Sequence, residues 1–261
     1  MTAAGSESVP TSRGTTSILV GVKGSGGAVD AYVDQLVETG SLAVADGLFD
    51  KTDAYLLASV PAGDGADQLI VLGNSTDAAY YGLTTLYQIL QQTDGATLRA
   101  FTICDYADVK TRGFIEGYYG SPWSTKDRVN LMTWGGYYKM NTYVYAPKDD
   151  PLHRNNWRGL YTEDQIENEI KPQAEAGNKS KVRFVYALAP FHNDGEARGK
   201  HFRFDTEEHY QEDLKELKAK YMQTIDAGVR QIALLADDST DWGAQYGNDN
   251  TYVRVLKDLT D

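Results

Sequence analysis

Hydrophobic positions in the first part of the chain alternate between strand-like runs and helical spacing. Short β-rich runs occupy residues 17–23, 54–60 and 68–72. Residues 28–39 and 77–92 instead repeat apolar side chains every three or four positions, which is typical of helices that cover a core. The side chains expected to face that core are Val29, Tyr32, Val33, Leu36 and Val37 in the first helix, and Tyr80, Leu83, Leu86, Tyr87 and Leu90 in the second. Up to about residue 108 the pattern predicts a small α/β domain.

A different regime begins near Arg112. Apolar, strand-like runs recur at residues 113–117, 141–146, 182–189 and 231–236, and helical patterns separate them at 126–139, 162–178 and 206–228. Strands that alternate with helices at this spacing favour parallel βαβ units. In a (β/α) barrel built from such units, the chemistry lies at the carboxyl ends of the strands. A closed barrel has eight units and only about four are visible, so the fold class is α/β with the first half of a TIM barrel.

Three segments follow from this division. Residues 1–14, rich in Ser, Thr and Gly, are a flexible lead-in. Residues 15–108 form the N-terminal α/β domain, and residues 109–261 form a partial, truncated barrel. A chain of 261 residues has room for both, with a sizeable core.

Charge and composition exclude several classes of function. The net charge of −12 repels phosphate backbones, so no nucleic-acid partner is expected. No stretch is long and apolar enough to span a bilayer, and the first 14 residues lack the apolar centre of a signal peptide. Cys104, the single cysteine, forms neither an internal disulfide nor a thiolate metal site. No cofactor and no metal ligand set are predicted.

The sharpest chemical signal is the run 234–238 (LLADD), which ends in Asp237 and Asp238. Two carboxylates after an apolar run are costly unless they face solvent, a metal or a reaction. Neighbouring side chains in a strand point to opposite faces, so both reach one pocket only where the strand ends. Close carboxylates separate each other's proton affinities, which lets one act as an acid while the other remains an anion. The alternative is an acidic turn that caps a following helix.

A second acidic pair, Asp149 and Asp150, follows Lys148 between two prolines. At the end of a strand, Lys148 is suited to bind sugar hydroxyls or to offset nearby carboxylates. The alternative is a solvated turn. Acidic loops also suit Mg²⁺ or Ca²⁺, so a metal-dependent phosphohydrolase stays open, although no EF-hand spacing is present.

Glycines and aromatic residues end the strand at 113–117. Gly117 stands where the backbone must turn or approach a ligand closely. Tyr118, Tyr119 and Trp123 follow, and aromatic rings stack well on the apolar face of a sugar. The alternative is that these rings are part of the core.

In their order, four motifs resemble glycoside hydrolase family 84, the O-GlcNAcases and the bacterial β-N-acetylglucosaminidases that are often called hyaluronidases. They are residues 112–120 (RGFIEGYYG), 122–123 (PW), 141–150 (NTYVYAPKDD) and the pair at 237–238. The resemblance covers residues 112–238. The preceding segment looks like the small domain, similar to the N-terminal domain of family 20, that precedes the barrel in this family.

The resemblance implies a retaining β-N-acetylglucosaminidase that removes terminal β-linked GlcNAc by substrate-assisted, oxazoline-forming catalysis. Asp237 would then polarise the 2-acetamido group, and Asp238 would be the general acid and base. Lys148 would bind sugar hydroxyls, and the backbone of Gly117 would accept a hydroxyl hydrogen bond. Tyr118 is expected in the same pocket, at a position where the family commonly has phenylalanine.

Two departures from the family limit the match. The family reads Ser-Pro-Gly where this chain has Ala189, Pro190 and Phe191. Sugar-binding residues that the family carries on later strands have no counterpart here, so a fragment is expected. The implied partner is a GlcNAc-containing glycan or glycoprotein, in a bacterial extracellular or cell-surface setting. The alternative is a non-catalytic carbohydrate-binding protein or an inactive fragment.

Overall fold

The computed structural model describes residues 8–9, 16–61, 67–93, 98–191, 201–237, 239 and 251–260. The chain divides into two compact units. The first unit comprises Met1–Thr111 with Tyr137–Lys139, and the second comprises Arg112–Gly136 with Met140–Asp261. Among the described residues, no helix combines the length and the apolar character needed to cross a membrane.

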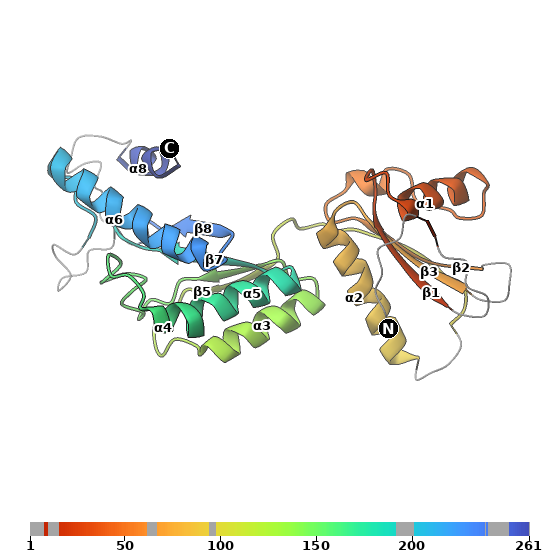
Figure 1. The fold of residues 1–261 in the computed structure, drawn as a ribbon, viewed down its shortest axis with the longest axis horizontal. Coiled ribbons are helices and arrows are strands. Elements are labelled where there is room, and N and C mark those ends of the chain that lie inside the picture. The colour runs from red at the N-terminus through yellow and green to blue at the C-terminus, as the bar shows by residue number, and fades with distance from the viewer. Residues whose placement is uncertain are drawn as a thin grey trace. The chain divides into compact units, whose positions relative to one another are not determined.

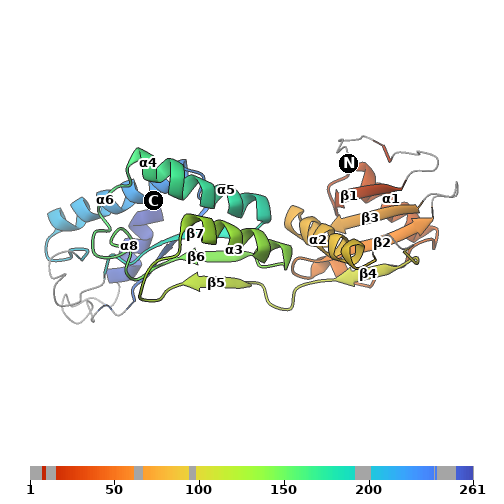
Figure 2. The ribbon, with the colours of Figure 1, turned by 90° about the horizontal axis from the view of Figure 1, so that it is seen from below.

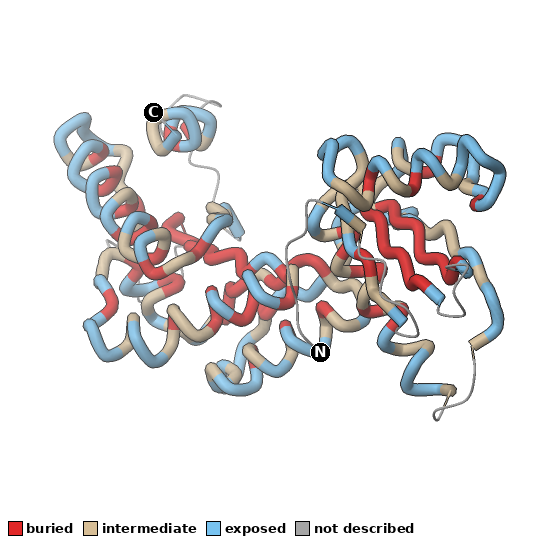
Figure 3. Tube along the Cα trace, turned by 45° about the vertical axis from the view of Figure 1, so that its right-hand side comes forward, coloured by how far each residue is buried: buried red, intermediate tan, exposed pale blue. Residues whose placement is uncertain are grey.

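The first unit is built on a four-stranded mixed sheet of order β1-β3-β2-β4. Its strands are β1 (Ser17–Val22), β2 (Tyr55–Pro61), β3 (Asp67–Gly73) and β4 (Thr102–Asp105). Its helices are α1 (Ala28–Glu38), the short 3-10 turn η1 (Leu48–Asp50) and α2 (Thr76–Gln92). Successive residues of β2 and β3 point to opposite faces, so α1 covers one face and α2 the other. Buried positions run along these central strands (Figure 3).

The face that α2 turns to the sheet matches the prediction in part, because Leu86 is buried and Tyr80 and Leu83 pack against the same core cluster. Tyr87 and Leu90, which were expected in the core, are exposed, whereas Ala78 and Gly82 are buried. A Cβ atom on Gly82 would lie only 2.6 Å from Cγ1 of Val71. The helix therefore approaches the sheet through its small residues together with Leu86, and a count of large apolar side chains places the centre of the buried face incorrectly.

The second unit contains four parallel strands in sequential order, β5-β6-β7-β8 (Figures 1 and 2). They are β5 (Gly113–Glu116), β6 (Thr142–Tyr145), β7 (Arg183–Leu188) and β8 (Gln231–Leu234). Each lies within the corresponding predicted run, so the α/β class with a parallel sheet is confirmed. That these strands form the first half of a TIM barrel stays a prediction.

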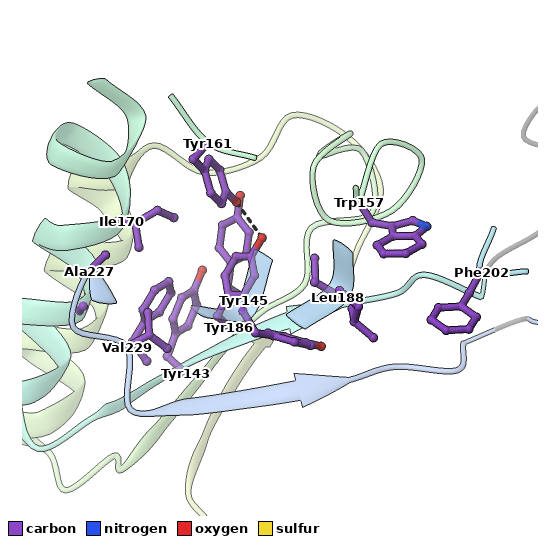
Figure 4. Close-up of a cluster of buried hydrophobic side chains, with 14 of the residues drawn as sticks. Tyr143, Tyr145, Trp157, Tyr161, Ile170, Tyr186, Leu188, Phe202, Ala227 and Val229 are labelled. Carbon is purple, nitrogen blue, oxygen red and sulfur yellow. Dashed lines mark hydrogen bonds between the residues drawn. The ribbon is translucent and has the colours of Figure 1, made fainter. Parts of the chain in front are cut away.

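The core of the second unit lies between the sheet and its helices. Alternate residues of β6 and β7 face the helices: Tyr143, Tyr145, Phe184, Tyr186 and Leu188. Tyr161, from the loop before α4, adds a fourth tyrosine, and its hydroxyl lies 3.1 Å from that of Tyr186 (Figure 4). A core so rich in tyrosine needs partners for its hydroxyl groups, and several of these lie in the loops at the carboxyl edge of the sheet.

The helices of this unit are α3 (Thr125–Tyr137), α4 (Glu163–Gln165), the π-helical turn η2 (Ile166–Ile170), α5 (Lys171–Ser180), α6 (Glu207–Asp226) and α8 (Thr251–Thr260). The predicted helix 162–178 is thus three consecutive pieces. Pro172 has no N–H to donate to the preceding turn, and the wider turn η2 stands directly before it. Helix α8 was not predicted.

Candidate active site

The loops after β5, β6 and β8 bring Tyr118, Lys148 and Asp237 to one edge of the parallel sheet, as the barrel interpretation predicted. The backbone N–H of Lys148 donates to the carbonyl oxygen of Tyr118 at 3.1 Å. The ammonium group of Lys148 forms an ion pair with Oδ2 of Asp237. The two side chains are 14% and 23% exposed, so the contact is sheltered but open to a ligand.

Asp237 has a left-handed backbone, with φ at +42°. The ladder between β7 and β8 continues one step past β8, because the N–H of Leu235 donates to the carbonyl of Leu188 at 2.8 Å. The chain then turns, and Asp237 leaves the strict alternation of the strand. Its neighbour Asp238, the expected acid, lies outside the described residues.

Gly117 is the first residue after β5 and is exposed, so its backbone is open to solvent at this edge. The ring of Tyr118 meets the ring of Trp123 edge-on, with centroids 5.7 Å apart. Burial raises the pKa of Tyr118. Its hydroxyl is buried and has no hydrogen-bond partner among the residues that the structure describes.

Trp123 is mainly a packing residue. Its ring stacks on Phe114 at 5.2 Å, and its backbone N–H donates to Glu116 at 2.9 Å. Tyr119 is different, because it is 65% exposed and lies under the guanidinium of Arg154, 5.6 Å from the ring centroid. Of the three aromatic residues proposed to stack on a sugar, Tyr119 is the one with an open ring.

Glu116 was not singled out from the sequence, although it supports the site. Its carboxylate is fully buried and pairs with Arg128 of α3, whose Nε and a terminal nitrogen donate at 2.8 and 2.9 Å. The hydroxyl of Tyr143 donates to the same carboxylate. Burial alone would raise the pKa of Glu116, but the hydrogen bonds from Arg128 and Tyr143 hold it below its ordinary value. The feature of the sequence that could have identified Glu116 is a carboxylate inside an apolar strand.

The second acidic pair fastens the loops of the site. Asp149 is exposed, and its Oδ2 accepts from the N–H of Gly120 at 2.6 Å, which ties the loop after β6 to the loop after β5. Asp150 accepts from the hydroxyl of Tyr145 at 2.6 Å and from the N–H of Leu152 at 2.9 Å. The interpretation as a freely solvated turn is therefore wrong for Asp150.

The structure describes Ala189, Pro190 and Phe191, where the sequence departs from the Ser-Pro-Gly of the family. Phe191 is buried and packs against Phe202 and Phe204, with ring centroids 5.8 and 5.9 Å away. Residues 192–200, which complete this loop, lie outside the described residues. The loop thus starts from an aromatic cluster rather than from the Ser-Pro-Gly turn of the family.

Comparisons with known proteins identify the family of the second unit. A family model described as beta-N-acetylglucosaminidase matches residues 112–260. The Protein O-GlcNAcases of Rattus norvegicus and Mus musculus are each 33% identical over 126 residues, covering 48% of this chain and 12% of their own length. The structure of CpGH84D matches with a TM-score of 0.81 and 37% identity, over 98% of this chain and 38% of that chain. CpGH84B matches with a TM-score of 0.67 and 28% identity, over 85% and 35%.

The chain therefore spans well under half the length of each of these relatives. The family match nevertheless covers more than half of the chain and includes all of β5 to β8. This chain belongs to the beta-N-acetylglucosaminidase family of glycoside hydrolases, within family 84.

Proposed function

We propose that the chain carries the acid and sugar-binding part of a retaining β-N-acetylglucosaminidase that hydrolyses terminal β-linked GlcNAc by substrate-assisted catalysis. The observation that carries the proposal is the pairing of Lys148 and Asp237 at the carboxyl edge of the parallel sheet. The family match and the 37% identity to CpGH84D support it.

In this mechanism the carbonyl oxygen of the substrate's 2-acetamido group attacks the anomeric carbon, and the bond to the leaving oxygen breaks. Asp238 donates its proton to that oxygen. The carboxylate of Asp237 accepts a hydrogen bond from the acetamido N–H and stabilises the positive charge that develops on the oxazoline. Asp238, now a base, takes a proton from the water that opens the oxazoline, which restores its protonated form, while Asp237 remains a carboxylate throughout.

Lys148 contributes binding and orientation. An ammonium group has three N–H donors, so Lys148 keeps one on Asp237 and offers the others to sugar hydroxyls. The exposed backbone of Gly117 is proposed to accept a hydroxyl hydrogen bond, with Tyr118 beside it. The exposed ring of Tyr119 offers an apolar face to the sugar or to the leaving group.

The natural substrate is proposed to be a GlcNAc-bearing glycan or glycoprotein, met at a bacterial surface or outside the cell. A second function, sugar binding without hydrolysis, rests on the same Lys148–Asp237 contact, which offers hydrogen bonds to a sugar whether or not an acid acts beside it. A protein that only binds would keep the contacts of Lys148 and gain nothing from an acid at residue 238.

Hydrolysis of an aryl β-N-acetylglucosaminide separates these functions. The assay compares this chain with the full gene product, with and without EDTA and an oxazoline-mimicking thiazoline. Turnover that resists EDTA and is blocked by the thiazoline supports the mechanism. Turnover that is lost on chelation would show that hydrolysis depends on a metal ion and would contradict this mechanism, whereas EDTA-sensitive hydrolysis of an aryl phosphate would favour the metal-dependent phosphohydrolase class. Sugar binding without turnover in the full gene product would leave the binding function.

A further inference from the structure

Strand β7 separates the two residues of the central ion pair. Lys148 follows β6 and Asp237 follows β8, and these strands are not neighbours in the order β5-β6-β7-β8. On the β8 side the connection is direct, because Leu235 donates its N–H to the carbonyl of Leu188 at the end of β7. The relative position of the pair therefore depends on how the loop after β6 is fastened to β7.

His153 makes that connection. Its Nδ1 lies 2.8 Å from the carbonyl oxygen of Ala187, and its own carbonyl accepts from the N–H of Ala189 at 3.0 Å. Its N–H donates to the carbonyl of Asp150 at 3.1 Å, which holds the loop in a turn. The bonds through Nδ1 and through the carbonyl of His153 join the loop to the end of β7.

The protonation state of His153 follows from its surroundings. A carbonyl oxygen only accepts, so Nδ1 carries the proton and donates to Ala187. The side chain is 0% exposed, and burial lowers the pKa of the imidazole, so the ring is neutral and Nε2 has no proton. Within the described part of the chain, Nε2 has no hydrogen-bond partner. The contact that matters for the loop is therefore made at Nδ1.

We propose that His153 is a positioning residue of the site: its Nδ1–H bond to Ala187 fastens the loop that carries Lys148 to the end of β7 and so sets the contact between Lys148 and Asp237. The inference rests on the proposed function, since it acts through sugar binding by Lys148. His153 touches neither the substrate nor the reacting atoms in this scheme.

Two substitutions distinguish the nitrogens of the ring. In His153→Asn the side-chain amide N–H takes the place of Nδ1–H, whereas His153→Gln extends toward the position of Nε2. We expect His153→Gln in the full gene product to raise KM and the Kd for the thiazoline about tenfold, because a small misplacement of a binding group is costly. His153→Asn should stay within about twofold of the wild type. The effect on kcat should be smaller than the effect on KM in both variants.

A double-mutant cycle with Lys148→Met separates positioning from general stability. If His153 acts through Lys148, His153→Gln has no further effect on thiazoline binding in the Lys148→Met background. Equal losses in the Asn and Gln variants, or a Gln effect that persists without Lys148, would overturn the proposal. Should His153→Gln fail to fold, a tenfold loss of binding by a folded His153→Asn overturns it instead. A wild-type protein that neither hydrolyses nor binds the sugar refutes the proposed function, whereas one that binds sugar and shows equal Asn and Gln variants refutes only the role of His153.

Discussion

Lys148 and Asp237 are 89 positions apart in the sequence, and their side chains form an ion pair at the carboxyl edge of the second sheet. The two residues follow β6 and β8, and parallel strands bring such loops to one edge. Among the described residues the two charged groups are paired with each other, and together they mark the proposed sugar-binding position.

Replacing Lys148 by methionine should weaken sugar binding more than turnover of bound substrate. A hydrogen bond to a charged group contributes ~1.5–3 kcal/mol, which corresponds to a rise in KM of roughly 10- to 100-fold. KM and the Kd for the thiazoline measure this effect. Lys179→Met is the control, because Lys179 lies on an exposed helical surface, where it pairs with Glu175. An unchanged KM in Lys148→Met would remove Lys148 from the site.

Asp238→Ala in the full gene product should slow substrates with poor leaving groups far more than substrates with good ones. Acid assistance contributes roughly 10²- to 10⁴-fold, and it matters most where the departing oxygen is basic. A series of aryl glycosides that spans leaving-group pKa gives the slope of log kcat/KM. Equal losses along the series would show that Asp238 is not the acid.

Glu116→Gln should strongly destabilise the second unit. Removing one partner of a buried ion pair costs ~3–5 kcal/mol, because Arg128 is left as an uncompensated buried charge. Denaturant unfolding of this chain measures the loss. Replacing both residues, as Glu116→Leu with Arg128→Met, should restore part of it. A single variant as stable as the wild type would contradict the strength of this pair.

The same pair predicts an acid limit to stability. Folding lowers the pKa of Glu116. The stability that this group contributes is therefore fully present above its pKa in the unfolded chain, about 4.3, and is lost as the pH falls through its pKa in the folded protein. The wild type should therefore lose stability more steeply below about pH 4 than Glu116→Gln does. Parallel acid-unfolding curves would refute this assignment.

Lys220 predicts a dependence of the same sign, but at high pH. Its side chain is fully buried, donates to the carbonyl of Gly159 and lies 3.8 Å from the ring centroid of Tyr161, and burial lowers its pKa to about 8. Between about pH 8 and about pH 10 the unfolded chain holds this proton and the native one releases it, so stability contributed by this group rises with pH.

Lys220→Met should accordingly stabilise the chain at pH 7. Removing the buried lysine contributes up to ~3 kcal/mol, and the loss of its hydrogen bond to Gly159 reduces this gain. The advantage should shrink as the pH approaches 10. Chemical denaturation of both proteins from pH 7 to pH 10 checks the trend. A constant difference between them across this range would show that Lys220 does not titrate there.

Tyr118→Phe should be neutral or stabilising by up to ~1 kcal/mol, because it removes a buried hydroxyl for which the described residues offer no partner. Sugar affinity should not change, since the ring keeps its contact with Trp123. Thermal unfolding together with the Kd for the thiazoline tests both statements. A tenfold loss of affinity would show that the hydroxyl binds the ligand.

The sequence predicted the parts of the fold that depend on local pattern. The strand positions of the second unit, and the edge at which Lys148 and Asp237 meet, follow from alternation of strands and helices alone. Glu116 and His153 were missed because their roles depend on partners elsewhere in the fold: Arg128 on α3 for the first and Ala187 on β7 for the second. No periodicity in one chain shows which carbonyl a loop histidine will reach.

The buried face of α2 was predicted only in part, for a related reason. Large apolar residues at helical spacing predict a core face only where the neighbouring surface leaves room for them. Here Gly82 and Ala78 allow close approach to the sheet, so Tyr87 and Leu90 remain outside. Likewise Pro172 divides the predicted helix 162–178, which apolar spacing alone did not indicate.

The left-handed backbone at Asp237 limits how this position can be studied and how it can evolve. Asn, Asp and Gly adopt such a conformation readily, whereas other residues are strained there. Asp237→Asn therefore isolates the loss of the negative charge, while Asp237→Ala combines that loss with a distortion of the turn after β8. Random substitutions that keep this turn intact should be enriched in the same three residue types, whatever the chemistry at the site demands.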